Sequence, residues 1–195
     1  MASADLEHEH DQEHDHGDEE RDAQVEARRR VALAQIRQYP DAVLRLRANT
    51  VDRFDENLAR LADRMTELMR DACGVGLAAT QVGVLQRLFV FQPHGATEAT
   101  VIVNPELVSR SGETDLADEG CLSLQGVHVP VERSTAVTLQ GVDVEGTPLR
   151  LELDEYPARV VQHELDHLDG VLMLERTDPE SRREALATLR HRPVL

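Results

Sequence analysis

The chain has 195 residues and a formal charge of −16 at neutral pH. This length suits one sizeable core, and the acidity argues against general affinity for nucleic acid. All 21 basic residues are arginines, which excludes a lysine Schiff base. No window approaches the roughly 20 apolar residues of a membrane span, and the N-terminus lacks the basic start and apolar run of a signal peptide. We therefore expect a cytoplasmic protein.

The first 22 residues form an acidic tail. They contain ten acidic residues and one arginine, a charge of −9, which leaves −7 for the rest of the chain. Residues 7–16 alternate histidines with carboxylates and almost lack apolar side chains. We expect residues 1–22 to be disordered and residues 23–195 to form one domain. A solvating tail without a specific role is the favoured interpretation, and weak collection of metal ions is the alternative.

Hydrophobic periodicity predicts helices and strands in the remaining chain. Residues 23–37 are typical of a helical lead-in. Residues 54–72 predict an amphipathic helix with Leu58, Leu61, Met65 and Leu68 on one side. Strand-like runs follow at residues 87–92, 100–104, 136–140 and 149–153, and a short helix is expected at residues 179–190.

A glycine-rich segment at residues 74–83 is the first candidate motif. It packs three glycines and two alanines around one amide side chain. Small residues let the backbone approach a ligand closely, and Gln81 can donate a hydrogen bond to a developing oxyanion. A tight turn that enters a strand explains the same glycines, so both interpretations stay open.

Residues 119–123 read Glu-Gly-Cys-Leu-Ser and hold one of only two cysteines. A thiolate at Cys121 binds divalent transition metals well, although many free cysteines are simply small buried hydrophobes. The other cysteine, Cys73, directly precedes the glycine-rich segment, and we expect it to be a packing residue near the site. Two cysteines cannot build a disulfide framework, which fits a reducing compartment.

Residues 162–167 contain an H-E-x-x-H motif. On a helix His163 and His167 fall at i and i+4, on one face. Two imidazoles so placed can bind one divalent metal, and Glu164 can reach a water beside it. A polar surface helix that happens to carry two histidines is the alternative.

The residues around this motif favour a helix. Pro157 suits a first turn, and Gly170 supplies a C-terminal stop. An apolar stripe at i, i+4 and i+7 lies between them, formed by Val161, Leu165 and Leu168.

The identity of the third ligand decides the chemistry of such a site. A zinc peptidase takes it from downstream, where Glu175 and Glu180 are candidates without a recognisable setting. Cys121 is the better candidate upstream, because one thiolate and two imidazoles leave a fourth position open for water.

Together, in this order, the three segments resemble the peptide deformylase family. The matching motifs are G-x-G-x-A-A-x-Q, E-G-C-L-S and Q-H-E-x-D-H-L-x-G, and the likeness runs from residues 36–41 to residues 174–176. The resemblance implies an α+β fold in which mixed or antiparallel sheets surround a central helix that carries the H-E-x-x-H motif. It also implies removal of the formyl group from formylmethionine at the N-terminus of nascent peptides, with release of formate.

The resemblance assigns the metal and its general base. Cys121, His163 and His167 would hold one divalent metal, expected to be Fe(II), with Zn, Ni or Co able to replace it. Glu164 would take a proton from water and pass it to the leaving amine.

The resemblance also assigns the groups that face the substrate. The Gln81 side chain and the backbone N–H of Leu122 would stabilise the oxyanion. Val75, Gly76 and Gly120 would pair with the main chain of the substrate, as in the addition of a strand.

Four residues near the motifs depart from the family or lack a clear role. Thr80 and Gln125 stand where the family often has proline, which puts the shape of the substrate pocket in doubt. We expect Arg133 to be a solvated surface residue, with pairing to an acidic group or positioning of the peptide as the alternative. We expect His128 to be structural rather than a ligand.

The C-terminal segment is the most basic part of this acidic protein, with Arg182, Arg183, Arg190 and Arg192. The resemblance implies docking of this helix at the ribosome, and an ordinary solvated helix is the alternative. We expect a monomer. Two rival functions are a metallopeptidase that does not need Cys121 and a metal-delivery protein that works through its histidine-rich tail.

Overall fold

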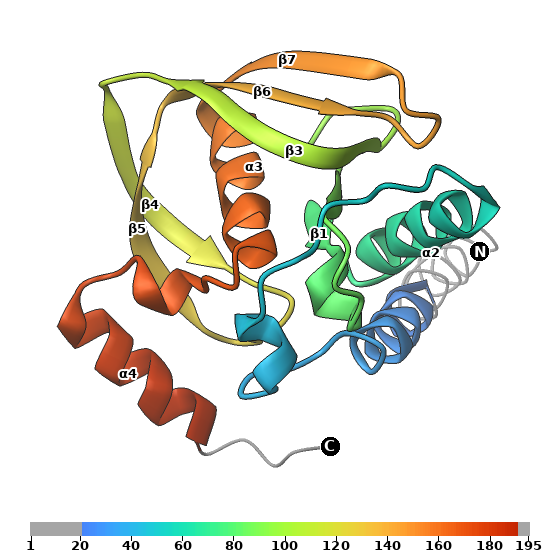
Figure 1. The fold of residues 1–195 in the computed structure, drawn as a ribbon. Coiled ribbons are helices and arrows are strands. Elements are labelled where there is room, and N and C mark those ends of the chain that lie inside the picture. The colour runs from blue at the N-terminus through green and yellow to red at the C-terminus, as the bar shows by residue number, and fades with distance from the viewer. Residues whose placement is uncertain (1–20, 191–195) are drawn as a thin grey trace, which may run out of the picture.

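The computed structural model describes residues 21–190 and shows an α+β fold (Figure 1). A five-stranded antiparallel sheet runs in the order β1-β2-β3-β6-β7, and β4 and β5 form a separate antiparallel pair. The strands are β1 (Gly76–Ala78), β2 (Leu88–Phe91), β3 (Thr100–Arg110), β4 (Thr114–Gly120), β5 (His128–Ser134), β6 (Ala136–Val142) and β7 (Pro148–Asp154). The α+β architecture expected from the family resemblance is confirmed.

The helices lie around and between these sheets. Residues 21–33 are helical, followed by α2 (Glu56–Asp71), α3 (Glu155–Leu168) and α4 (Pro179–Arg190), with short 3-10 turns η1 (Ala42–Arg45), η2 (Ala79–Val82) and η3 (Met173–Glu175). Of the tail expected over residues 1–22, only Arg21 and Asp22 are among the described residues, and both are helical. The rest of that tail lies outside the described residues.

Helix α2 begins where the sequence supplies a cap. The Asp55 side chain accepts hydrogen bonds from the backbone N–H groups of Asn57 at 2.9 Å and Leu58 at 3.2 Å. Such a cap satisfies two donors that the helix itself leaves unpaired. The predicted apolar side packs into the core, with Met65 completely buried. The predicted helix over residues 54–72 is confirmed to within two residues at each end.

Helix α3 passes between the five-stranded sheet and the β4–β5 pair (Figure 1). Ten of its 14 residues are buried, as expected of a helix covered on several sides. The predicted stripe is buried, with Val161, Leu165 and Leu168 at most 6% exposed. Gly170 follows at a φ of 74°, and a Cβ there would lie 2.5 Å from the Arg45 carbonyl oxygen. Glycine is therefore required at this helix end.

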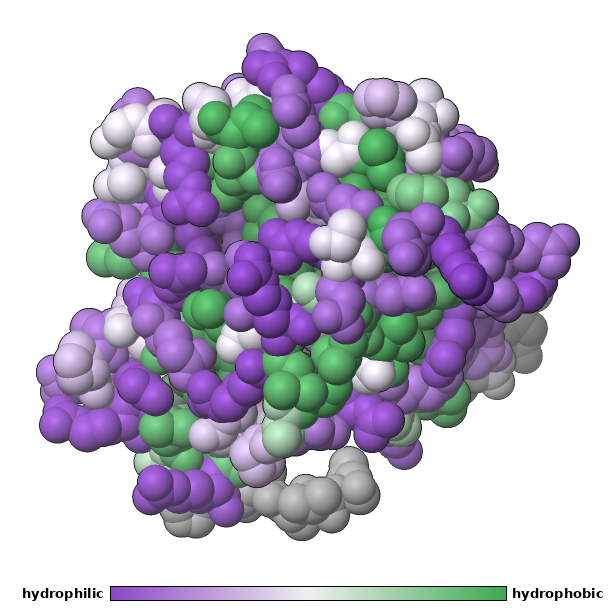
Figure 2. Space-filling view, viewed as in Figure 1, coloured by the Kyte–Doolittle hydropathy of each residue, from purple (hydrophilic) through white to green (hydrophobic). Residues whose placement is uncertain are grey.

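Of the seven strands within residues 21–190, four were predicted, and β1, β4 and β5 were not. The predicted runs correspond to β2, β3, β6 and β7, although β3 continues six residues beyond its predicted end at residue 104. No described helix is long and apolar enough to cross a membrane. Figure 2 shows hydrophilic side chains over most of one face, with smaller apolar groups between them.

Candidate metal centre

Three ligand atoms converge at the buried face of α3. His163 and His167 project from this helix, and Cys121 lies in the turn that follows β4. The Cys121 Sγ lies 3.2 Å from His167 Nε2, which lies 3.2 Å from His163 Nε2. All three ligand atoms fall within 4.8 Å of one another. A thiolate and two imidazoles at this spacing fit one divalent transition metal.

Neither of the two downstream carboxylates joins this cluster in the described chain. Glu175 pairs with Arg45 at 3.0 Å and accepts a hydrogen bond from the Leu172 N–H at 2.9 Å. Glu180 lies exposed in the first turn of α4. Cys121 is therefore the third member of the cluster, and the ligand set that a peptidase would need is not formed among residues 21–190.

Glu119 orients the first histidine. Its Oε2 lies 2.9 Å from His163 Nδ1, which leaves His163 Nε2 directed at His167 Nε2. Carboxylates commonly fix the orientation of a ligand histidine in this way. Burial opposes ionisation of Glu119, but hydrogen bonds from His163 and Arg133 outweigh it and lower its pKa to about 2. The carboxylate is therefore charged at neutral pH.

A buried ionic network extends from Glu119 behind the site. Arg133 donates to both Glu119 oxygens at 2.9 and 3.0 Å and to Asp166 at 2.6 Å. Arg159 donates to Glu119 at 3.0 Å, and Arg176 donates to Asp166 at 2.6 and 3.0 Å. The network ties β4, β5 and the loop after α3 to the metal-bearing helix.

The expectation that Arg133 is a solvated surface residue was wrong. Its side chain is 7% exposed. Along β5 the buried residues alternate as Val129, Val131 and Arg133, so the arginine falls on the inward face. The period-2 pattern of a strand was therefore the signal that could have placed Arg133 inside.

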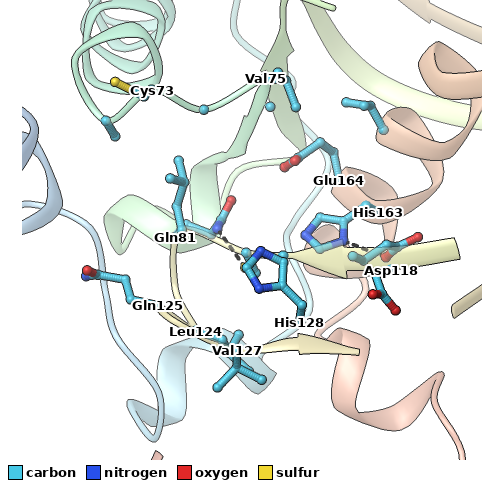
Figure 3. Close-up of a pocket in the computed structure, with 18 of the residues that line it drawn as sticks. Cys73, Val75, Gln81, Asp118, Leu124, Gln125, Val127, His128, His163 and Glu164 are labelled. Atoms are coloured by element: carbon cyan, nitrogen blue, oxygen red, sulfur yellow. Dashed lines mark hydrogen bonds and ion pairs between the residues drawn. The ribbon is translucent and has the colours of Figure 1, made fainter. Parts of the chain in front are cut away.

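Glu164 faces the cavity beside the cluster (Figure 3). It is 4% exposed, and its Oε2 has no hydrogen-bond partner among the described residues. Burial raises the pKa of this carboxyl to about 7. Gly76 of β1 lies opposite, and a Cβ there would come within 2.3 Å of Glu164 Oε1. The glycine thus makes room for the carboxylate.

Gln81 lies on the other side of Cys121. Its amide oxygen accepts from the Ala78 N–H at 2.9 Å, and its nitrogen donates to Ser123 Oγ at 3.0 Å and to Cys121 Sγ at 3.6 Å. The amide is 2% exposed, so its orientation is fixed by these contacts. Ser123 was part of the recognised motif but carried no assigned role.

A cavity of about 410 Å³ opens over these groups. It is lined by Glu164 and by every residue predicted to face the substrate, namely Val75, Gly76, Gln81, Gly120 and Leu122. Cys121 and His163 form part of its wall, whereas His167 is 1% exposed behind them. Gln125 also lines the cavity.

The predictions for two further residues can be compared with their positions in the structure. His128 is exposed, lines the cavity and does not join the ligand cluster. Cys73 lies beside the cavity, as expected, but it is exposed rather than a packing residue. Its φ of 56° at the turn after α2 accompanies this outward placement.

This fold and this site define a class, the metal-dependent hydrolases. A family model described as polypeptide deformylase matches residues 33–183. The chain belongs to this family.

The matched relatives align with this chain over most of their own length. The peptide deformylase of Thermotoga neapolitana is 47% identical over 147 residues, which cover 75% of this chain and 88% of the relative. Peptide deformylase 1 of Corynebacterium glutamicum is 44% identical over 163 residues, 82% of this chain and 96% of the relative.

Solved structures agree with the fold. The peptide deformylase from Thermotoga maritima has 44% sequence identity and a TM-score of 0.71, covering 74% of this chain and 97% of that chain. The peptide deformylase from Legionella pneumophila has 38% identity and a TM-score of 0.76, covering 81% and 98%.

Proposed function

We propose that this chain removes the formyl group from the N-terminal formylmethionine of newly synthesised peptides and releases formate. The observation that carries the proposal is the convergence of Cys121, His163 and His167 beside the buried carboxylate of Glu164. Membership of the deformylase family supports it.

Cys121, His163 and His167 would hold one divalent metal. We propose Fe(II) as the native ion, with Zn, Ni or Co able to replace it. When bound, such an ion lowers the pKa of a water molecule towards neutrality and polarises the substrate carbonyl. The single thiolate also makes the site sensitive to oxidation of Cys121.

Glu164 moves the proton. Its Oε2, which has no partner among the described residues, accepts a proton from the attacking water. The same atom then returns that proton to the nitrogen of the leaving peptide, since an amine leaves only after protonation. The proton is thus transferred from water to the new N-terminus as formate departs.

Gln81 and Leu122 stabilise the charge that develops on the formyl oxygen. The Gln81 amide nitrogen lies 3.6 Å from Cys121 Sγ, so it sits beside the reacting atoms. Leu122 directly follows Cys121 and lines the same cavity. Oxyanion donors of this kind contribute about 3 kcal/mol each.

The edge of the main sheet binds the peptide backbone. Among the described strands β1 pairs only with β2, so its other edge is open beside the cavity. Val75 and Gly76 lie at this edge, and Gly120 lies across the cleft at the end of β4. An extended peptide can add there as a further strand.

Formate release from a formyl-Met tripeptide tests the proposal. The protein should be prepared anaerobically and assayed metal-free and after loading with Fe(II) or Ni(II). Metal-dependent release with the Met–X bond intact supports deformylation, whereas cleavage of that bond without formate would establish the peptidase rival. Deleting residues 1–22 separates the metal-delivery rival: formate release should survive the deletion, whereas a metal-storage role of the tail should collapse.

We propose in addition that the protein acts as a cytoplasmic monomer that docks at the ribosome through α4. Ala185 packs this helix against the core, while Arg182, Arg183 and Arg190 are exposed. Reversing these three charges should weaken co-sedimentation with ribosomes without changing formate release from a tripeptide. Unchanged co-sedimentation would exclude docking through this face.

A further inference from the structure

A helix that precedes most of the family match contributes to the wall of the active-site cavity. The family model begins at residue 33, yet both Arg29 and Leu33 line the cavity. They are four residues apart in the helix over residues 21–33 and therefore share one face. Leu33 is 8% exposed and packs in the same core cluster as Ala72. The helix is thus anchored, and Arg29 has a defined place beside the cleft.

The helix that carries Arg29 packs near the end of the cleft away from the metal ligands. Ala72, which shares a cluster with Leu33, directly precedes Cys73. Figure 3 shows Cys73 and Gln125 on the side of the cavity opposite His163 and Asp118. We call this part of the cavity, with Arg29, Cys73 and Gln125, the outer end. A peptide that has its formyl group at the metal ligands and extends along Val75 towards Cys73 would meet the outer end with the residues that follow methionine.

Charge is distributed unevenly along the cleft. Asp118, Glu119 and Glu164 line the metal end. Arg159 also lines the cavity, but its guanidinium is committed to Glu119 at 3.0 Å and to the Val131 carbonyl at 2.8 Å. Arg29 is 40% exposed, and it forms an ion pair with the exposed Glu26 at 3.6 Å. An exposed ion pair at this distance contributes little to stability, so the Arg29 guanidinium can leave Glu26 and bind a ligand instead.

We propose that Arg29 is a specificity-determining residue that binds a carboxylate downstream of the formylated methionine. Peptides with Asp or Glu among the residues after methionine are then preferred over peptides with Lys or Arg there. The inference rests on the proposed function. An arginine suits this role because it stays charged and offers a planar fork of donors to a carboxylate.

The test uses amidated formyl-Met tetrapeptides in which Glu, Gln or Lys occupies the second, third or fourth position and alanine the others. At low ionic strength we expect kcat/KM to be about 2- to 5-fold higher for Glu than for Gln at one position, mainly through KM, and lowest for Lys. The preference should fade at high salt because exposed charges are screened. Arg29→Ala should abolish it, Arg29→Lys should retain part of it, and Arg29→Glu should reverse it.

Arg28→Ala and Arg30→Ala are matched controls, since both residues are exposed on the same helix and neither lines the cavity. Both should keep the preference for Glu. The inference is overturned if the all-alanine peptide is deformylated and the ratio of kcat/KM for Glu to that for Gln is the same in wild type and Arg29→Ala at all three positions. No formate from the all-alanine peptide would overturn the proposed function, and this inference with it.

Discussion

The two ends of the cleft differ in the burial of their charged groups and in the partners that hold them. At the metal end, Glu119 and Arg133 are at most 7% exposed and joined by short charge-assisted hydrogen bonds. At the outer end, Arg29 is 40% exposed and Cys73 is exposed. The comparison teaches that the groups proposed to perform the reaction are fixed by buried partners, whereas the groups proposed to meet the rest of the peptide remain free to adapt.

The buried network at the metal end does not add stability simply by being ionic. Desolvation of two charges offsets most of their attraction, yet removal of one partner from a buried pair costs about 3–5 kcal/mol. Its benefit is orientation, because Glu119 fixes His163 and Arg133 fixes Glu119. Substitutions at the metal end should therefore have large effects on the rate of formate release or on metal affinity, and substitutions outside it should have small effects.

Glu164→Gln should give the largest effect. The amide has the size of the carboxyl group but cannot take a proton from water, so formate release should fall by about 10²–10⁴-fold. Metal content, measured by atomic absorption, should stay at one ion per chain because Glu164 is not in the ligand cluster. Activity within tenfold of wild type at full metal content would assign the proton transfer to another group.

Gly76→Ala tests how closely the open edge of β1 approaches the carboxylate. The new Cβ would lie 2.3 Å from Glu164 Oε1, so the side chain of Glu164 must move. Misplacement of a reacting group by about 1 Å costs on the order of 10²-fold in rate, and we expect kcat to fall by that amount.

Gly112→Ala is the matched control for this glycine. A Cβ at Gly112 meets no atom within 4 Å, so kcat should stay at the wild-type value. Wild-type kcat in Gly76→Ala would mean that Glu164 reacts from a different position.

Glu119→Gln should weaken metal binding without removing a ligand. The hydrogen bond to His163 loses its charged acceptor, and such partners are typically worth 10- to 100-fold in metal affinity. Competition with a chelator measures this. Glu132→Gln is the control, because Glu132 is exposed on β5 and accepts only from Thr114 at 3.0 Å among the described residues. Equal affinity in the two variants would remove Glu119 from the metal site.

The parts of the fold with a regular apolar pattern were predicted from the sequence. Helix α2 and strand β7 show clear helical and alternating patterns, and both lie where expected. Strand β1 was not predicted because it has only three residues, Gly-Leu-Ala, without alternation. Strand β4 was missed because it is acidic and largely exposed, and β5 contains Pro130. These strands form through pairing with distant partners, which local pattern does not show.

The metal ligands were predicted because spacing and chemistry point to them directly. Two histidines at i and i+4 share a face in any helix, and the ordered motifs brought Cys121 to them. The network behind them was not predicted, since Arg133 and Arg159 meet Glu119 only after β4, β5 and α3 pack together. The position of Arg29 beside the cleft was not predicted for the same reason, because its helix reaches the cleft only through tertiary packing.

Thr80→Val should give the smallest effect, although Thr80 is completely buried and touches the metal-bearing helix. Its Oγ1 donates to the His167 carbonyl oxygen at 3.2 Å, but that oxygen also accepts from the Gly170 N–H at 3.2 Å. The bond therefore reaches the backbone of a ligand residue without orienting its imidazole. We expect a loss of about 1 kcal/mol in the free energy of urea unfolding, and kcat/KM within about twofold of wild type. Thr66→Val removes a comparable bond to the Ala62 carbonyl in α2, far from the ligands in sequence, and should cost a similar amount. If Thr80→Val lowers metal affinity as Glu119→Gln does, orientation at the metal end depends on the backbone of α3 as well as on its ionic partners.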